Sequence, residues 1–353
     1  MQIALIGWQT GGKSTLFTAL TGSESSLGEE AHLGTAIVPD NVLDSLHELY
    51  PPAKKINARV DYLDVAGLAT SQKNSGLKRS LINHLQGANV LAIVIGTFQL
   101  GDEPAGDLAE EVLLQLSDLE TELLLSDLQV AENRMERIQA AKQRSQKIDQ
   151  IELQAMEKVL EGLNNETPLR LVELDPTEEK AVRGHGFLTQ KPLLIIVNHG
   201  EEQNGEELTK ILEEKINSED KRLEVLNGSL EAEIAVLDDE DKELFLEEMG
   251  LSAPASDRVI NAGFSLLGLI RFFTVGDDEV RAWPIRKETN AVDAAGEIHS
   301  DLSRGFIRAE VVGSTDLLRL GALSKCRDEG ILRLEGKQYI VKDGDIMHIR
   351  FAV

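Results

Sequence analysis

The chain has 353 residues, too many for one compact hydrophobic core, so we expect two or three domains. Its 61 acidic and 36 basic residues give a formal net charge of -25, which disfavours binding to DNA or to an anionic membrane through overall charge. Cys326 is the single cysteine, which excludes a disulfide framework, and the sequence indicates neither a membrane span nor a signal peptide, so we expect a soluble cytoplasmic protein.

An apolar run of strand length, residues 2–6, opens the chain and leads into a glycine-rich loop. The loop has Gly7, four residues, then Gly12, Lys13 and Ser14, with a helical pattern after it. This is the phosphate-binding loop pattern, in its confirming context of a strand before and a helix after. Glycines let the backbone approach phosphates closely, and the N-terminus of the helix favours an anion. The predicted phosphate-binding residues here are Gly7, Trp8, Gln9, Thr10, Gly11, Gly12, Lys13, Ser14 and Thr15.

A second strand, residues 58–63, ends in Asp64, three residues before Gly67. In nucleoside triphosphatases a carboxylate at this place holds Mg²⁺ through water, and the glycine N–H meets the γ-phosphate. We therefore predict Mg²⁺ ligands at Ser14 and Asp64 and a phosphate contact at Gly67. Leu68 stands where Ras-like enzymes carry a Gln that orients the attacking water. Because an aliphatic side chain can neither donate nor accept, we identify no catalytic residue and expect slow hydrolysis.

Two polar stretches, residues 23–33 and 69–76, are expected to be mobile loops beside the phosphates. Thr35, the one threonine near the first loop, starts an expected strand, which argues against a metal-capping role. A short helix is expected from Asp40 to about Tyr50.

From about residue 104 the apolar residues recur at steps of three and four, and this continues loosely to residue 159. The pattern predicts an antiparallel helical hairpin or coiled coil. The expected tip carries a basic cluster: Arg134, Arg137, Lys142, Arg144 and Lys147. Two interpretations remain open for this cluster. It is either a docking face for RNA phosphates or an acidic partner, or an ordinary solvated helical face.

A buried strand, residues 193–197, is followed by Asn198-His199-Gly200-Glu201. GTPases carry Asn-Lys-x-Asp here, and the Asp accepts hydrogen bonds from guanine N1–H and the 2-amino group. Adenine offers neither donor, the longer Glu201 does not fit the same geometry, and Asn198 can face the adenine 6-amino group. The box therefore favours ATP, unless Glu201 is only a surface acid. The predicted base-binding residues are Asn198, His199 and Glu201, with Gly228, Ser229 and Leu230 closing over the base.

Short strand patterns separated by turns occupy residues 272–353, with one helix expected at 291–299. A small mixed sheet with one helix suggests a β-grasp module. Such modules commonly bind partners and seldom carry chemistry.

The phosphate loop, residues 64–68, residues 198–201 and the runs at 279–283, 305–309 and 335–345 together resemble the YchF subfamily of Obg-like P-loop NTPases along the whole chain. The resemblance implies an α/β fold in which a Ras-like P-loop NTPase domain is interrupted by an α-helical coiled coil and followed by a β-grasp (TGS) domain. The implied bounds are 1–102 and 175–271 for the nucleotide domain, 103–174 for the coiled coil and 272–353 for TGS. It also implies a preference for ATP over GTP, weak hydrolysis, and association with ribosomes through the coiled-coil tip and TGS domain.

The sequence departs from that subfamily in three places. The first polar loop is short and has Gly28 where the usual Thr stands. Thr10 replaces an Asn, which weakens the case for a potassium ion in catalysis, and the loop after Phe98 lacks the His of relatives. Nucleotide binding is thus better supported than turnover.

Three functions compete on these grounds: a slow ATPase switch, a GTPase of the same architecture, and an interaction protein that senses nucleotide with little or no turnover. A P-loop kinase of small molecules fits less well, because it leaves residues 64–67 and 198–201 unexplained.

Overall fold

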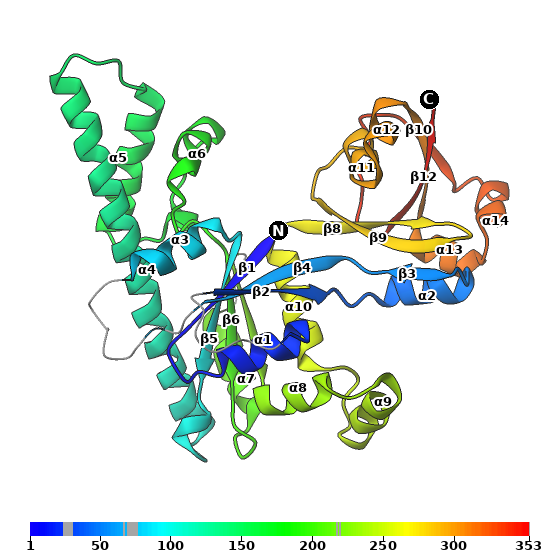
Figure 1. The fold of residues 1–353 in the computed structure, drawn as a ribbon, viewed down its shortest axis with the longest axis horizontal. Coiled ribbons are helices and arrows are strands. Elements are labelled where there is room, and N and C mark those ends of the chain that lie inside the picture. Colours follow the sequence, from blue (N-terminus) through cyan, green and yellow to red (C-terminus); the bar gives the residue numbers. More distant parts are fainter. Residues whose placement is uncertain (24–30, 66–67, 69–76, 217, 219, 353) are drawn as a thin grey trace. The chain divides into compact units, whose positions relative to one another are not determined.

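The computed structural model describes residues 1–23, 31–65, 68, 77–216, 218 and 220–352 (Figure 1). Two compact units form, Met1–Thr35 with Asp61–Leu266, and Ala36–Val60 with Leu267–Val353. Within the described residues, no helix has the length and apolar character needed to cross a membrane.

A six-stranded sheet in the order β2-β4-β1-β5-β6-β7 forms the centre of the first unit. Its strands are β1 (Gln2–Ile6), β2 (Ala31–Ile37), β4 (Arg59–Val65), β5 (Val90–Gly96), β6 (Leu193–Asn198) and β7 (Lys221–Leu226). The pairs formed by β4, β1, β5, β6 and β7 are parallel, and β5 and β6 are buried almost throughout. Parallel strands deliver their carboxyl ends to one edge, where ligands of such sheets bind.

The first unit also contains shorter helices, some of which pack on the sheet and others on neighbouring helices. They are α1 (Lys13–Thr21), α3 (Arg79–Gly87), α6 (Pro176–Val182), α7 (Gly205–Ile216), α8 (Gly228–Ala235), α9 (Asp239–Glu248) and α10 (Ala255–Leu266). Asn227 caps α8 by accepting from Ser229 N and Leu230 N. Glu231 in α8 accepts from the backbone N–H groups of Ala255 and Ser256, so the acidic residue fixes the start of α10.

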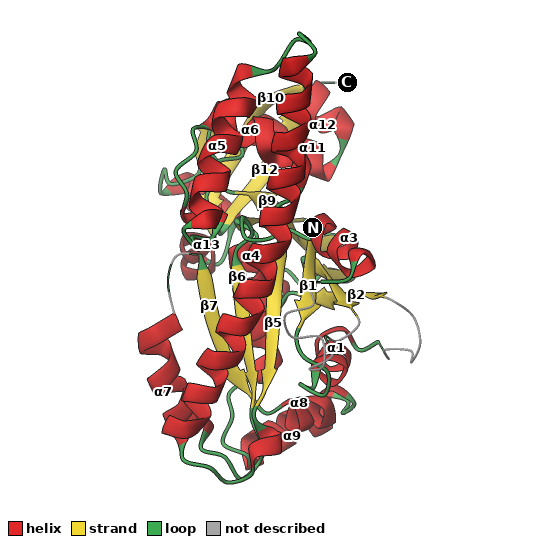
Figure 2. Ribbon diagram, turned by 90° about the vertical axis from the view of Figure 1, so that its left-hand side faces the viewer, coloured by secondary structure: helices red, strands yellow, loops and turns green. Residues whose placement is uncertain are grey.

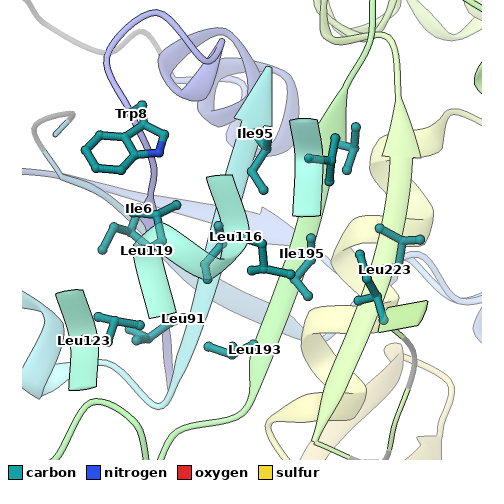
Figure 3. Close-up of a cluster of buried hydrophobic side chains, with 14 of the residues drawn as sticks. Ile6, Trp8, Leu91, Ile95, Leu116, Leu119, Leu123, Leu193, Ile195 and Leu223 are labelled. Atoms are coloured by element: carbon teal, nitrogen blue, oxygen red, sulfur yellow. The ribbon is translucent and has the colours of Figure 1, made fainter. Parts of the chain in front are cut away.

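The predicted helical hairpin is confirmed as α4 (Ala105–Gln143) and α5 (Gln150–Asn164), with one difference in its extent. The first half of α4 belongs to the core of the sheet: Leu116, Leu119 and Leu123 pack in one cluster with residues of β5 and β6 (Figure 3). Figure 2 shows α4 lying along these strands and continuing beyond them. Its second half packs with α5 around a separate cluster that includes Ala131, Ile138, Ala155, Met156 and Val159.

The second unit contains a mixed sheet in the order β11-β10-β12-β8-β9-β3. Its strands are β3 (Lys54–Ile56), β8 (Leu269–Val275), β9 (Glu279–Arg286), β10 (Phe306–Gly313), β11 (Arg333–Glu335) and β12 (Asp345–Phe351). The expected helix is α11 (Ala291–Ile298), which packs on the sheet; α12 (Ser300–Arg304), α13 (Ser314–Leu320) and α14 (Leu323–Asp328) are additional. Not every strand pattern expected within 272–353 forms a strand: at residues 338–341 Ile340 forms only an isolated bridge to Asn290.

Residues 36–60 belong to the second unit, although they lie between β2 and β4 in the chain. Asp40 caps α2 (Asn41–Leu49) and lies 3.3 Å from the guanidinium of Arg271. Strand β3 pairs in parallel with β9, and the Tyr50 hydroxyl accepts from Leu323 N. The sequence did not predict that residues 36–60 belong to the second unit; we call this placement the exchange of residues 36–60.

Candidate nucleotide-binding site

The loop between β1 and α1 can be built only with glycine at two positions. A Cβ on Gly7 would lie 2.3 Å from the carbonyl oxygen of Val94, so β1 and β5 could not approach as they do. Gly12 has φ +83, and a Cβ there would lie 2.1 Å from Asn198 Nδ2. Residues 8–15 line a cavity of about 290 Å³ in front of the first turn of α1. Unpaired N–H groups at a helix start favour an anion in such a cavity.

The predicted metal ligands come together at this cavity. Lys13 Nζ lies 3.1 Å from Asp64 Oδ1, and Ser14 Oγ donates to Asp64 Oδ2 at 3.0 Å. Lys13 and Asp64 are both buried. A hydroxyl and a carboxylate are hard oxygen donors of the kind that Mg²⁺ takes, and Mg²⁺ needs few protein ligands because it keeps several waters. The residues therefore fit the ion. Gly67 and Gly28 lie outside the described residues.

Leu68 is held against the phosphate loop by its backbone. Its N–H donates to Gly7 O at 2.9 Å, and its carbonyl accepts from Gln9 N at 2.7 Å. These bonds form a parallel bridge between Leu68 and Trp8, beyond the ends of β1 and β4. Both side chains are buried in the same apolar cluster. An aliphatic side chain in this cluster has no group that could orient a water molecule.

A second cavity, of about 460 Å³, adjoins the phosphate loop. Of the predicted base-binding residues, Asn198, His199, Glu201 and Ser229 line it. Gly228 and Leu230 do not line it, although Gly228 contacts Asn198. The cavity and the phosphate-loop cavity share Gly12 and Thr15. A single ligand with a phosphate chain and a flat ring could therefore occupy both.

Asn198 acts in this structure as a link between loops. Its Oδ1 accepts from Gly228 N at 2.7 Å, and its Nδ2 donates to Gly11 O at 3.4 Å. The sequence-based hypothesis had this side chain facing an adenine amino group. In the structure the carboxamide instead joins the phosphate loop to the start of α8.

Several residues that line the second cavity were not predicted to bind the base, and Phe98 and Gln203 are the two of them with large side chains other than acids. Phe98 lies in a 3-10 turn, η2 (Phe98–Leu100), directly after β5, and it is more than a third exposed. A partly exposed aromatic at the carboxyl end of a central strand was the available signal. Gln203 follows the predicted box by two residues and has no sequence signature. Gln99 Nε2 donates to Thr10 O, so the same turn also touches the phosphate loop.

One member of the predicted basic cluster, Arg134, is ion-paired within the hairpin. Arg134 forms two hydrogen bonds to the carboxylate of Glu152, of 2.7 and 2.6 Å, and these lower the pKa of Glu152. Its guanidinium thus joins α4 to α5. The remaining basic residues are exposed: Arg137 and Lys142 near the end of α4, and Arg144 and Lys147 in the turn before α5.

Comparisons with known proteins agree along the whole chain. A family model described as "50S ribosome-binding GTPase" matches residues 2–199, and a model named YchF-GTPase_C matches residues 269–352. The "Ribosome-binding ATPase YchF" of Bacillus subtilis is 36% identical over 99% of this chain and 98% of that protein. The protein of that name from Haemophilus influenzae is also 36% identical, with the same coverage. Among solved structures, the YchF GTPase of Schizosaccharomyces pombe matches with a TM-score of 0.80 at 26% identity, covering 99% of this chain and 97% of that one.

Proposed function

Because the chain belongs to the YchF family, we propose that it is a ribosome-associated nucleotide switch that binds ATP in preference to GTP and hydrolyses it slowly. The observation that carries the proposal is that Gly12 and Thr15 line both cavities. The phosphate chain would occupy the glycine loop, and the base would lie between Phe98 and residues 198–203.

In this proposal Lys13 neutralises phosphate charge, while Ser14 and Asp64 hold Mg²⁺. The bound ion would offset the charge on the β- and γ-phosphates. Gly67 would contact the γ-phosphate through its N–H. Slow turnover follows from Leu68, whose buried aliphatic side chain leaves the position of the water-orienting Gln without a polar group.

ATP preference rests on Glu201, which lines the base cavity one methylene longer than the Asp of the guanine-reading box. GTP is the second candidate, since the family model for residues 2–199 and the solved yeast relative carry the name GTPase. A third candidate, a nucleotide sensor without turnover, is favoured by Leu68. Phosphate release measured with and without ribosomes separates it from the first two.

Paired titrations test the base preference. With Mg²⁺ present, we expect ATP to bind at least about tenfold more tightly than GTP, a difference of about 1.4 kcal/mol. Lys13→Ala should abolish binding of both. Glu201→Asp should shift the preference toward GTP, because the shorter carboxylate can accept from the guanine N1–H and 2-amino groups.

Two results of these titrations would count against the proposal. Tighter binding of GTP by the unmodified chain would select the GTPase. Undiminished ATP binding by Lys13→Ala would remove the phosphate loop from the site altogether.

The exposed basic turn supports ribosomal RNA as the partner. Residues 137–148 contain four basic and no acidic residues, although the whole chain carries a net charge of -25. A local positive end on an acidic protein favours contact with phosphates at that end and not elsewhere. The β-grasp (TGS) sheet would supply a second contact with the ribosome.

A further inference from the structure

Gln203 has a buried side chain that makes four hydrogen bonds to residues in or next to the wall of the base cavity. Its Oε1 accepts from Gly200 N at 2.9 Å and from Thr97 Oγ1 at 2.8 Å. Its Nε2 donates to Thr97 O at 2.9 Å and to Gly101 O at 2.6 Å. The side chain is 5% exposed. A primary amide can donate two hydrogen bonds and accept two, so all the hydrogen-bonding groups of the Gln203 side chain are satisfied.

These bonds connect two separate segments of the cavity wall. Thr97 and Gly101 flank the η2 turn, which presents Phe98, and Gly200 directly precedes Glu201. The segments touch, since a Cβ on Gly200 would lie 3.4 Å from Phe98 Cβ. Thr97 N also donates to Asn198 O at 2.9 Å, which continues the β5–β6 pairing into the wall. Gln203 thus fixes the spacing between the aromatic ring and the acidic residue.

We propose that Gln203 is a positioning residue for the nucleotide base, holding Phe98 and Glu201 at a fixed separation before the ligand arrives. This rests on the proposed nucleotide function and adds to it the residue that orders the base pocket. Without Gln203 the two segments would have to be ordered when the ligand binds, and that ordering reduces affinity. The phosphate loop is also held by bonds to Leu68 and Asn198, which lie outside the turn that Gln203 fixes, so we expect its order to survive the loss of Gln203.

The role therefore predicts a loss confined to ligands that carry a base. Gln203→Met keeps the length of the side chain and removes every hydrogen bond. We expect it to raise the Kd for Mg·ATP about tenfold and to change the Kd for inorganic tripolyphosphate, measured with Mg²⁺ by calorimetry, by less than about twofold. A residue needed only for folding would weaken both ligands together.

Thr97 supplies a matched pair of variants that leave Gln203 in place. Thr97→Val removes the hydroxyl that donates to Gln203 and keeps the shape, whereas Thr97→Ser keeps the hydroxyl. We expect Thr97→Val to weaken ATP about threefold, because one of four bonds is lost, and Thr97→Ser to bind like the unmodified chain. This pair still decides the question if Gln203→Met does not fold.

The outcomes separate this inference from the proposed function. Equal weakening of ATP and tripolyphosphate, or no weakening of ATP in either Gln203→Met or Thr97→Val, would overturn the positioning role while leaving the nucleotide site intact. Failure of the unmodified chain to bind ATP would overturn both.

Discussion

Leu68 is held to the phosphate loop by its backbone, while its aliphatic side chain carries no group that could orient a water molecule. Its chemistry excludes it as a water-orienting group, and this follows from the residue type alone. Its backbone bonds to Gly7 and Gln9 could not be read from the sequence, because they depend on where β4 ends beside β1. The carboxamide partners of Asn198, at the end of β6, could not be predicted from sequence either. Gln203 was missed because three of its four side-chain bonds go to Thr97 and Gly101, which are far from it in the sequence.

Asp127 gives a residue-scale prediction about pH. It is buried in α4, where its carboxylate accepts from Leu188 N at 2.8 Å and from Thr189 N and Oγ1 at 2.7 Å each. Burial raises the pKa of Asp127 from 3.8 to about 6, against the lowering effect of these bonds. Because the pKa in the folded state is the higher one, the stability contributed by Asp127 is fully present below about pH 3.8 and is lost as pH rises through about 6.

Asp127→Asn removes this titration. The difference in unfolding free energy between the unmodified chain and Asp127→Asn should fall by about 2 kcal/mol between pH 4 and pH 7, from about 1.4 kcal/mol per pKa unit. Urea unfolding of both chains across that range measures it. If the difference grows with pH instead, the three hydrogen bonds outweigh burial and the pKa of Asp127 is lowered.

At the scale of elements, α4 is a long helix that runs from near the end of the base-cavity turn to the tip of the hairpin. Its 39 residues span about 58 Å at 1.5 Å per residue. Leu108, eight residues after Leu100 of the base-cavity turn, is fully buried in the core, and Lys142 lies at the exposed turn. One unbroken helix thus joins the neighbourhood of the base cavity to the basic end. The leucine periodicity predicted the helix, but a repeat of three and four could not tell that half of it packs on the sheet.

We therefore expect the basic residues at the end of the hairpin to contact the ribosome. Neutralising Lys142 and Arg144 together, as Lys142→Gln with Arg144→Gln, should reduce cosedimentation with ribosomes and flatten its dependence on salt, because two phosphate contacts are lost. Lys210→Gln with Lys215→Gln is the matched control, since it removes the same charge from exposed positions of α7. Equal losses in the two double variants would show that overall charge, and not the turn, governs binding.

At the scale of the whole chain, the exchange of residues 36–60 could not be predicted from local pattern. Leu43 and Leu46 are both fully buried, and their spacing predicts an amphipathic α2. The spacing does not say which sheet covers them. That is decided by the pairing of β3 with β9, across more than 200 residues of sequence. Five strands of the β-grasp sheet come from the C-terminal part of the chain, where the sequence shows strand patterns. The sixth, β3, comes from a segment that the sequence assigns to the nucleotide domain.

Because residues 36–60 pack in the second unit, we predict that a chain truncated after the first unit will not be stable. A chain ending at Leu266 would lose β9, the partner of β3, and would expose Leu43 and Leu46, each contributing about 1.5–3 kcal/mol when buried. We expect this truncated chain to aggregate and to bind ATP more weakly. Excision of residues 40–56 should repair it, because Val38 N donates to Ala58 O at 2.9 Å and the ends of the excised segment are therefore adjacent.

A short Gly-Ser link between residues 39 and 57 closes that gap. The truncated and excised chain should remain monomeric in light scattering and regain ATP affinity, whereas truncation alone should not. If the chain ending at Leu266 is already monomeric and binds ATP like the full chain, residues 36–60 do not need the second unit, and the exchange has no bearing on the stability of the nucleotide site.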